Sequence, residues 1–100
     1  MGCWLDKRND RAFSVGLEGK CRHLDGDSWN RNEVITKCFS CAVENGYDVF
    51  ALQNGGECYA GYPYENYERH GASSVCVNGR GGPWSNNVYK LKGKLLEIIV

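Results

Sequence analysis

Six cysteines are the residues of this sequence with the widest range of chemistry. Cysteines form disulfides, hold zinc or act as reactive thiols. Cys38 and Cys41 form a C-x-x-C pair, which occurs in zinc sites and in thioredoxin-like redox sites. Zinc usually takes a second closely spaced ligand pair, whereas Cys58 and Cys76 are far apart and both histidines stand alone. We therefore favour three disulfides, which indicate an oxidising, extracellular compartment, and keep zinc binding and free thiols as alternatives.

No arrangement in the sequence favours catalysis. The motifs G-x-S-x-G and H-E-x-x-H do not occur, and nothing fixes the separation of the glutamates between residues 57 and 68. Asp25 and Asp27 begin a polar loop that resembles a calcium loop, but Trp29 occupies the place of an EF-hand ligand. We expect a non-catalytic protein without a resident cofactor or metal ion.

The charge of the chain excludes two classes of partner. Twelve basic and twelve acidic residues give a formal net charge of zero. A neutral chain without a basic face lacks the electrostatic attraction that nucleic acids require. No apolar run approaches the roughly 20 residues of a membrane span. We therefore expect neither nucleic-acid binding nor membrane insertion.

The remaining candidate chemistry is recognition by aromatic rings and amides. Four of the six tyrosines lie between residues 59 and 67, in a segment bracketed by Cys58 and Cys76. Aromatic rings offer flat apolar faces with few rotatable bonds, and amides and carboxylates offer paired donors and acceptors. Sugars have the matching pattern, with apolar C–H faces surrounded by hydroxyl groups. The candidate ligand-binding residues are Gln53, Glu57, Tyr59, Tyr62, Tyr64, Tyr67, Trp84, Asn86 and Asn87.

The alternative is that the tyrosines of a small disulfide-rich domain fill its core. We assign Tyr47 and Tyr89 to the core or the sheet. Tyr62, Tyr64 and Tyr67 lie beside a proline and charged residues, so we expect these three rings to be exposed. A loop held by a disulfide at each end would present them with little loss of entropy on binding.

A small α+β domain must position these residues. Its one clear helix is expected at residues 32–45, where apolar residues recur at helical spacing. Asn30 or Ser28 can cap its N-terminus, and Gly46 is a natural stop. Residues 54–56, Asn-Gly-Gly, predict a hairpin turn. The expected strands are residues 3–5, 13–17, 47–53, 57–61 and 86–91.

The chain length fits a single domain. We expect a domain at residues 1–91, followed by an apolar tail or edge strand at residues 92–100. An exposed apolar strand invites pairing with another chain, so we expect the tail to be covered or shared between copies. The candidate residues for self-association are Leu95, Leu96, Ile98, Ile99 and Val100.

The order of four short motifs resembles that of WSC domains, over residues 2–91. Residues 2–6, GCWLD, resemble the GCY-x-D opening of the family. Residues 50–53, FALQ, and residues 56–59, GECY, are similar to its FA-x-Q strand and its return strand. Residues 81–84, GGPW, resemble the closing motif of a divergent branch found in secreted proteins.

The resemblance implies a PAN/apple-like fold, in which one helix packs on a small curved antiparallel sheet and disulfides staple a loop-rich chain. It also implies a secreted, lectin-like carbohydrate-binding or adhesion module, with a glycan or glycoprotein as partner. Two alternatives are an extracellular protein–protein interaction module of the PAN/apple type and a secreted structural or defence protein. The disulfides that the resemblance implies are Cys3–Cys76, Cys38–Cys58 and Cys21–Cys41.

Overall fold

The computed structural model describes residues 2–91. They contain one α-helix and a five-stranded antiparallel sheet, which confirms the expected α+β class. The strand order across the sheet is β1-β5-β3-β4-β2. The elements are β1 (Cys3–Leu5), β2 (Val15–Gly16), α1 (Val34–Glu44), β3 (Val49–Gln53), β4 (Glu57–Gly61) and β5 (Ser85–Lys90).

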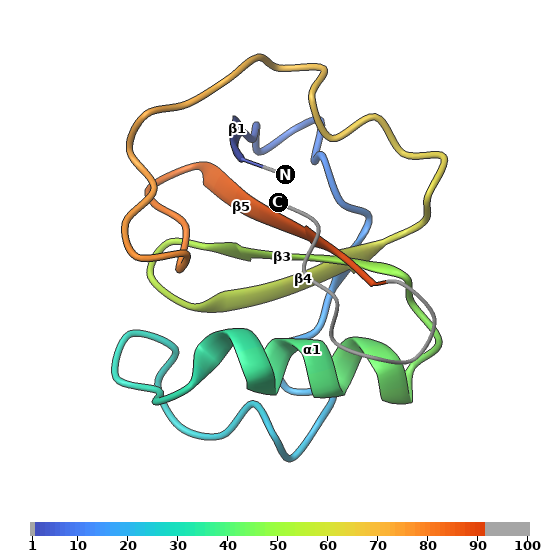
Figure 1. Cartoon of the computed structure of the whole chain (residues 1–100), viewed down its shortest axis with the longest axis vertical. Helices are drawn as coiled ribbons and strands as arrows, with labels where there is room; N and C mark the ends of the chain where they lie inside the picture. The colour runs from blue at the N-terminus through green and yellow to red at the C-terminus, as the bar shows by residue number, and fades with distance from the viewer. Residues whose placement is uncertain (1, 92–100) are drawn as a thin grey trace.

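The sheet lies between the helix and the loops. α1 runs along one side of the three longest strands, and the loop that leads to β5 arches over the other side together with the N-terminal segment (Figure 1). β3 is central and is buried along its whole length. It forms the expected hairpin with β4, in which Gln53 pairs with Glu57 across the turn.

Each face of the sheet carries its own apolar core, because successive residues of a strand point to opposite faces. Phe50 and Leu52 of β3 belong to the core shared with α1. Val49 and Ala51 belong to the core on the other face. Gln53 follows the same alternation as Ala51, so its side chain lies on the face away from the helix.

The two ends of α1 differ in how well the sequence predicted them. The helix starts later than expected, and neither Asn30 nor Ser28 caps it. The N-cap residue is Glu33, which has a φ of 52° and makes no capping hydrogen bond with its side chain. Asn30 lies three residues before this position, in a loop where its Nδ2 donates to Asp27 Oδ2 at 3.4 Å. The other end is as expected, since Gly46 takes the left-handed conformation, with a φ of 81°, and completes a Schellman motif.

Three disulfides join these elements, and they are the three that the family resemblance implies. The pairs are Cys3–Cys76, Cys21–Cys41 and Cys38–Cys58. The first joins β1 to the loop before β5, the second joins the N-terminal loop to α1, and the third joins α1 to β4. No free cysteine remains, so no thiolate is available to hold zinc or to act as a nucleophile.

The predicted tail at residues 92–100, and with it the predicted self-association, lies outside the described residues. The domain boundary at residue 91 therefore stays a prediction. Within residues 2–91, no helix is long enough and apolar enough to cross a membrane.

Candidate functional site

An open groove lies on the sheet face away from α1, at the end where β3 turns into β4. It has a volume of about 280 Å³ and is formed by three separate parts of the chain. We call it the Trp84 groove. Its lining residues are Arg11, Gln53, Asn54, Glu57, Tyr59, Pro83 and Trp84. Four of the nine candidate ligand-binding residues are therefore brought together, namely Gln53, Glu57, Tyr59 and Trp84.

Two aromatic rings of the groove share one cation. The guanidinium carbon of Arg11 lies 4.7 Å from the ring centroid of Tyr59 and 5.5 Å from that of Trp84. Such cation–π contacts favour a fixed arrangement of the rings. Burial raises the pKa of the Tyr59 hydroxyl, so it remains neutral and donates to the carboxylate of Glu57 at 3.4 Å. Trp84 is 42% exposed, and the guanidinium carbon of Arg8 also lies 5.8 Å from its ring centroid.

A buried polar network lies below the groove and is centred on Asp6. The carboxylate of Asp6 accepts hydrogen bonds from the Ala12 N–H at 2.8 Å, from Arg11 Nε at 2.7 Å and from Gln53 Nε2 at 2.8 Å. Gln53 Nε2 also donates to Asn86 Oδ1 at 2.9 Å. Burial opposes ionisation of Asp6, but these hydrogen bonds together hold its pKa below the ordinary value of 3.8. The buried anion thus fixes both Arg11 and Gln53.

The backbone at Trp84 is held in an unusual conformation. Trp84 has a φ of 46°, in the left-handed region that bulky residues rarely adopt. A tight turn carries it, because Gly82 and Ser85 exchange two backbone hydrogen bonds around Pro83 and Trp84. The Asp6 N–H donates to the Trp84 carbonyl at 2.8 Å. Such conformations persist only where the surroundings enforce them, and they concentrate at functional sites.

Tyr62 and Tyr64 lie at the other end of β4 and do not line the groove. Their rings are stacked, with centroids 5.4 Å apart and an interplanar angle of 6°. The ring of Tyr47 packs edge-on against Tyr62 at 5.5 Å. Tyr62 and Tyr64 are exposed as expected, and Tyr64 is 81% exposed. The tyrosine-rich segment therefore does not form a single surface with Trp84.

The expected exposure of Tyr67 is wrong. Its side chain is only 9% exposed. The ring stacks on Phe13 with a centroid distance of 6.1 Å and meets Trp4 edge-on at 6.2 Å. Among residues 2–91, no second helix covers the sheet face away from α1, and Tyr67 covers part of this face. This ring is therefore not available to a ligand.

The side chains of Asn86 and Asn87 lie on opposite faces of β5, and each makes a hydrogen bond within the protein. Asn86 is fully buried beneath the groove and accepts the hydrogen bond from Gln53. Asn87 faces the helix side, where its Oδ1 accepts the Gly81 N–H at 2.8 Å. Neither side chain lines the groove. Both hold the segments that form it.

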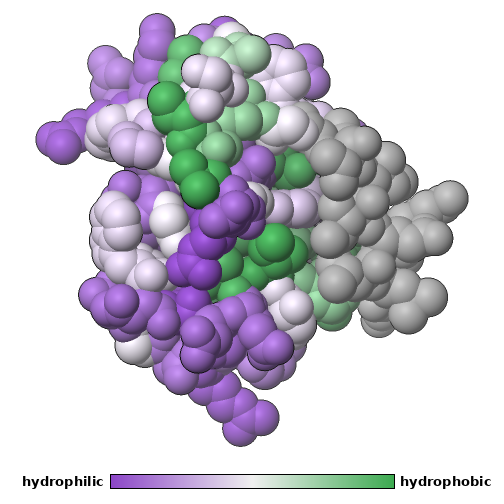
Figure 2. Space-filling model, turned by 60° about the vertical axis from the view of Figure 1, so that its left-hand side comes forward, coloured by the Kyte–Doolittle hydropathy of each residue, from purple (hydrophilic) through white to green (hydrophobic). Residues whose placement is uncertain are grey.

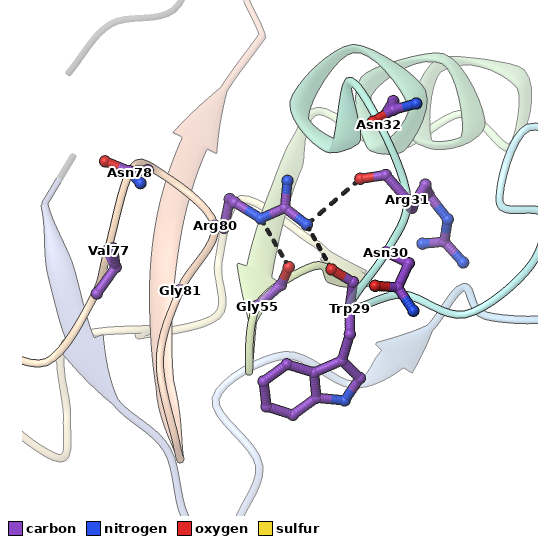
Figure 3. Close-up of a pocket in the computed structure, with 9 residues that line it drawn as sticks. All are labelled: Trp29, Asn30, Arg31, Asn32, Gly55, Val77, Asn78, Arg80 and Gly81. Atoms are coloured by element: carbon purple, nitrogen blue, oxygen red, sulfur yellow. Dashed lines mark hydrogen bonds between the residues drawn. The ribbon is translucent and has the colours of Figure 1, made fainter.

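Sequence reasoning missed Arg11 and a second depression on the other side of the β3–β4 turn. We call this depression, of about 500 Å³, the Trp29 pocket (Figure 3). Arg80 crosses its floor, where Nε donates to the Gly55 carbonyl at 2.9 Å and Nη2 donates to the carbonyls of Trp29 and Arg31 at 3.2 and 3.3 Å. The lining residues are Trp29, Asn30, Arg31, Asn32, Gly55, Val77, Asn78, Arg80 and Gly81. The one feature of the sequence that could have indicated this pocket is Trp29, a tryptophan within a polar loop.

The sequence matches no protein-family model and no curated protein. The WSC resemblance therefore rests on the motif residues themselves. The structure brings at least one residue of each motif to the Trp84 groove or beneath it, and among these are Asp6, Gln53, Tyr59 and Trp84. Within residues 2–91, no cluster of three or more His, Cys, Asp or Glu side chains is arranged to hold a metal ion.

Proposed function

We propose that this protein is a secreted, non-catalytic carbohydrate-binding or adhesion module, and that the Trp84 groove is its glycan-binding site. The observation that carries the proposal is the convergence of Trp84, Tyr59 and Glu57 in one open groove. The Trp84 ring packs on the apolar face of a sugar ring. The Glu57 carboxylate and the Asn54 amide exchange hydrogen bonds with sugar hydroxyls.

The rigidity of the groove supports this proposal. Arg11 is fixed by the buried carboxylate of Asp6, and it contacts the rings of Tyr59 and Trp84. A site that is ordered before binding loses little conformational entropy when a ligand arrives. Shallow contacts with a single sugar are weak, so this preorganisation matters more here than in a deep pocket.

The molecule as a whole also fits the proposal. Three disulfides in a chain of this size are typical of extracellular domains. The packing of α1 against an antiparallel sheet is compatible with a PAN/apple-like fold, and the motif order resembles that of WSC domains. On this proposal the chain is a divergent WSC-like domain.

A glycan-array screen of the oxidised protein tests the proposal. We expect a selective hit that is lost in Trp84→Gly, because glycine removes the ring and adopts a positive φ at little cost. Tyr64→Ala is the matched control, since it removes an exposed ring outside the groove, and it should retain binding. Near-ultraviolet circular dichroism checks that both variants are folded.

Two results would contradict the proposal. One is a blank array from a folded sample, which would favour a protein partner instead. The other is a hit that survives in Trp84→Gly but is lost in Tyr64→Ala, which would place the site on the tyrosine pair.

A further inference from the structure

The Trp84 groove continues into the Trp29 pocket through a short apolar strip. Asn54 and Pro83 line both the groove and the strip. The strip and the Trp29 pocket share four further lining residues, namely Trp29, Gly55, Val77 and Gly81. Val75 and Gly82 complete the strip. Three depressions therefore form one path across the β3–β4 turn. Figure 2 brings this side of the molecule forward and shows hydrophobic surface between hydrophilic side chains.

The ring of Trp29 is held as a flat surface at the far end of this path. It lies against Gly55, where an added Cβ would stand 3.2 Å from Trp29 Cε3. Gly55 also has a φ of +88°, which glycine adopts without strain. The Trp29 side chain is nevertheless 60% exposed. One side of the indole thus meets the turn, and the rest of the ring is open to a ligand.

Polar groups without partners surround the two rings. Within residues 2–91, the side-chain amides of Asn32, Asn54 and Asn78 make no hydrogen bond. Arg80 uses Nε and Nη2 on three backbone carbonyls, which leaves the donors of its Nη1 unused within the same residues. An exposed ring flanked by unused amide donors and acceptors therefore occurs at both ends of the path.

We propose that the ligand is an internal stretch of a linear polysaccharide, which follows this path with one sugar ring on Trp84 and another on Trp29. This inference rests on the proposed function and names its ligand class. A single sugar fills only one of the three depressions. The Trp29 pocket is then a second subsite, and the chain between the two rings crosses the strip beside Pro83.

The course of the path distinguishes a polysaccharide from a peptide or a folded protein. An extended peptide binds by adding a strand to a sheet edge, whereas the edges of this sheet are β1 and β2. The path instead crosses the turn between β3 and β4. A protein partner needs a continuous apolar interface core, whereas the apolar strip is short and has polar groups at both ends.

The experiment measures affinity against chain length by titration calorimetry. The probes are cello-, manno-, chito- and hyaluronan oligosaccharides, each from the disaccharide to the octasaccharide. In the series that binds, we expect the octasaccharide to bind roughly tenfold or more tightly than the disaccharide, because contacts at the second ring add to those at the first. Trp29→Ala should remove this difference and leave disaccharide affinity unchanged.

The controls separate this inference from the proposed function. Trp84→Gly should lower the affinity for oligosaccharides of every length, and Tyr64→Ala should leave all of these affinities unchanged. Equal affinity at all lengths, or an unchanged profile in Trp29→Ala, would overturn the extended path and leave the Trp84 groove in place. The absence of binding in every series would overturn both. Because Trp29 is exposed and Arg80 binds its backbone carbonyl, Trp29→Ala leaves no cavity and keeps that hydrogen bond.

Discussion

At the scale of single residues, Asp6 shows how a buried charge supports an exposed surface. Its carboxylate is removed from water and receives hydrogen bonds from a backbone amide, a guanidinium and a side-chain amide. A buried carboxylate without partners would be costly, so these donors keep it ionised. Loss of the charge would free Arg11 from Asp6. The rings of Tyr59 and Trp84 would then lose the fixed cation that they both contact.

Asp6 should make the stability of the protein sensitive to acid. Because its pKa is lowered in the folded state, its contribution is fully present above the ordinary value of 3.8 and is lost as the pH falls through the lowered pKa. Asp6→Asn should reduce the free energy of unfolding at pH 7 by about 1.5–3 kcal/mol. Urea titrations at neutral and acidic pH check this. The difference in unfolding free energy between Asp6→Asn and the wild type should become smaller in acid. Differences that stay constant with pH would contradict this prediction.

Tyr67 and Tyr64 provide a matched pair for a second prediction at this scale. Tyr67→Ala removes a buried ring from the core and should cost about 3–5 kcal/mol of unfolding free energy, as other buried aromatic residues do. Tyr64→Ala removes a ring that is 81% exposed and should change it by only about 0.5 kcal/mol. Thermal and urea denaturation measure both. Similar effects from the two variants would show that the burial of Tyr67 is not what stabilises this face.

At the scale of elements, α1 and the β3–β4 hairpin form the frame to which the loops attach. Cys38–Cys58 joins them inside the core, where both cysteines are fully buried. Cys21–Cys41 holds the N-terminal loop against the same helix, but Cys21 is only half-buried. The two bridges have the same sequence separation, 20 residues. Either bridge therefore reduces the entropy of the unfolded chain by the same amount. The two bridges differ in how tightly the protein packs around them.

Serine substitutions at these bridges should separate the two contributions. Cys38→Ser with Cys58→Ser buries two hydroxyls in an apolar core and should abolish the yield of folded protein. Cys21→Ser with Cys41→Ser should lose about 2–4 kcal/mol, the usual effect of one disulfide, and still fold. Yields from an oxidising expression host and denaturation curves provide the measurement. An equal loss of folded protein from both pairs would contradict the difference.

Local sequence patterns predicted most elements, because strand alternation and a glycine stop are local properties. The strands at residues 3–5 and 57–61 and the left-handed Gly46 are where the pattern places them. The start of the helix was not predictable in this way. Its capping candidate Asn30 lies three residues before the actual N-cap, Glu33, and belongs to a loop in which its Nδ2 donates to Asp27. Only the folded structure shows where this loop ends and the helix begins.

At the scale of the whole molecule, the residues that line the Trp84 groove were more predictable than the residues of the Trp29 pocket. Residue type alone selected Trp84, Tyr59 and Glu57, because rings and carboxylates suit sugar recognition wherever they lie. The Trp29 pocket depends on Arg80, which reaches a carbonyl 51 residues away. The burial of Tyr67 depends on which loop covers the second sheet face. Neither relation has a local sequence signal.

The late positions of Cys76 and Trp84 in the chain determine when the Trp84 groove is complete. A ribosome makes a chain from its N-terminus, and Cys76 is made 73 residues after its partner Cys3. In each of the two disulfides that involve α1, the second cysteine follows the first after only 20 residues. Trp84 is made later still. β5 follows Trp84, so one wall of the groove and one neighbour of β3 are both missing until residues 84–90 are made. A chain that ends just before Trp84 contains all six cysteines and still lacks one wall of the groove.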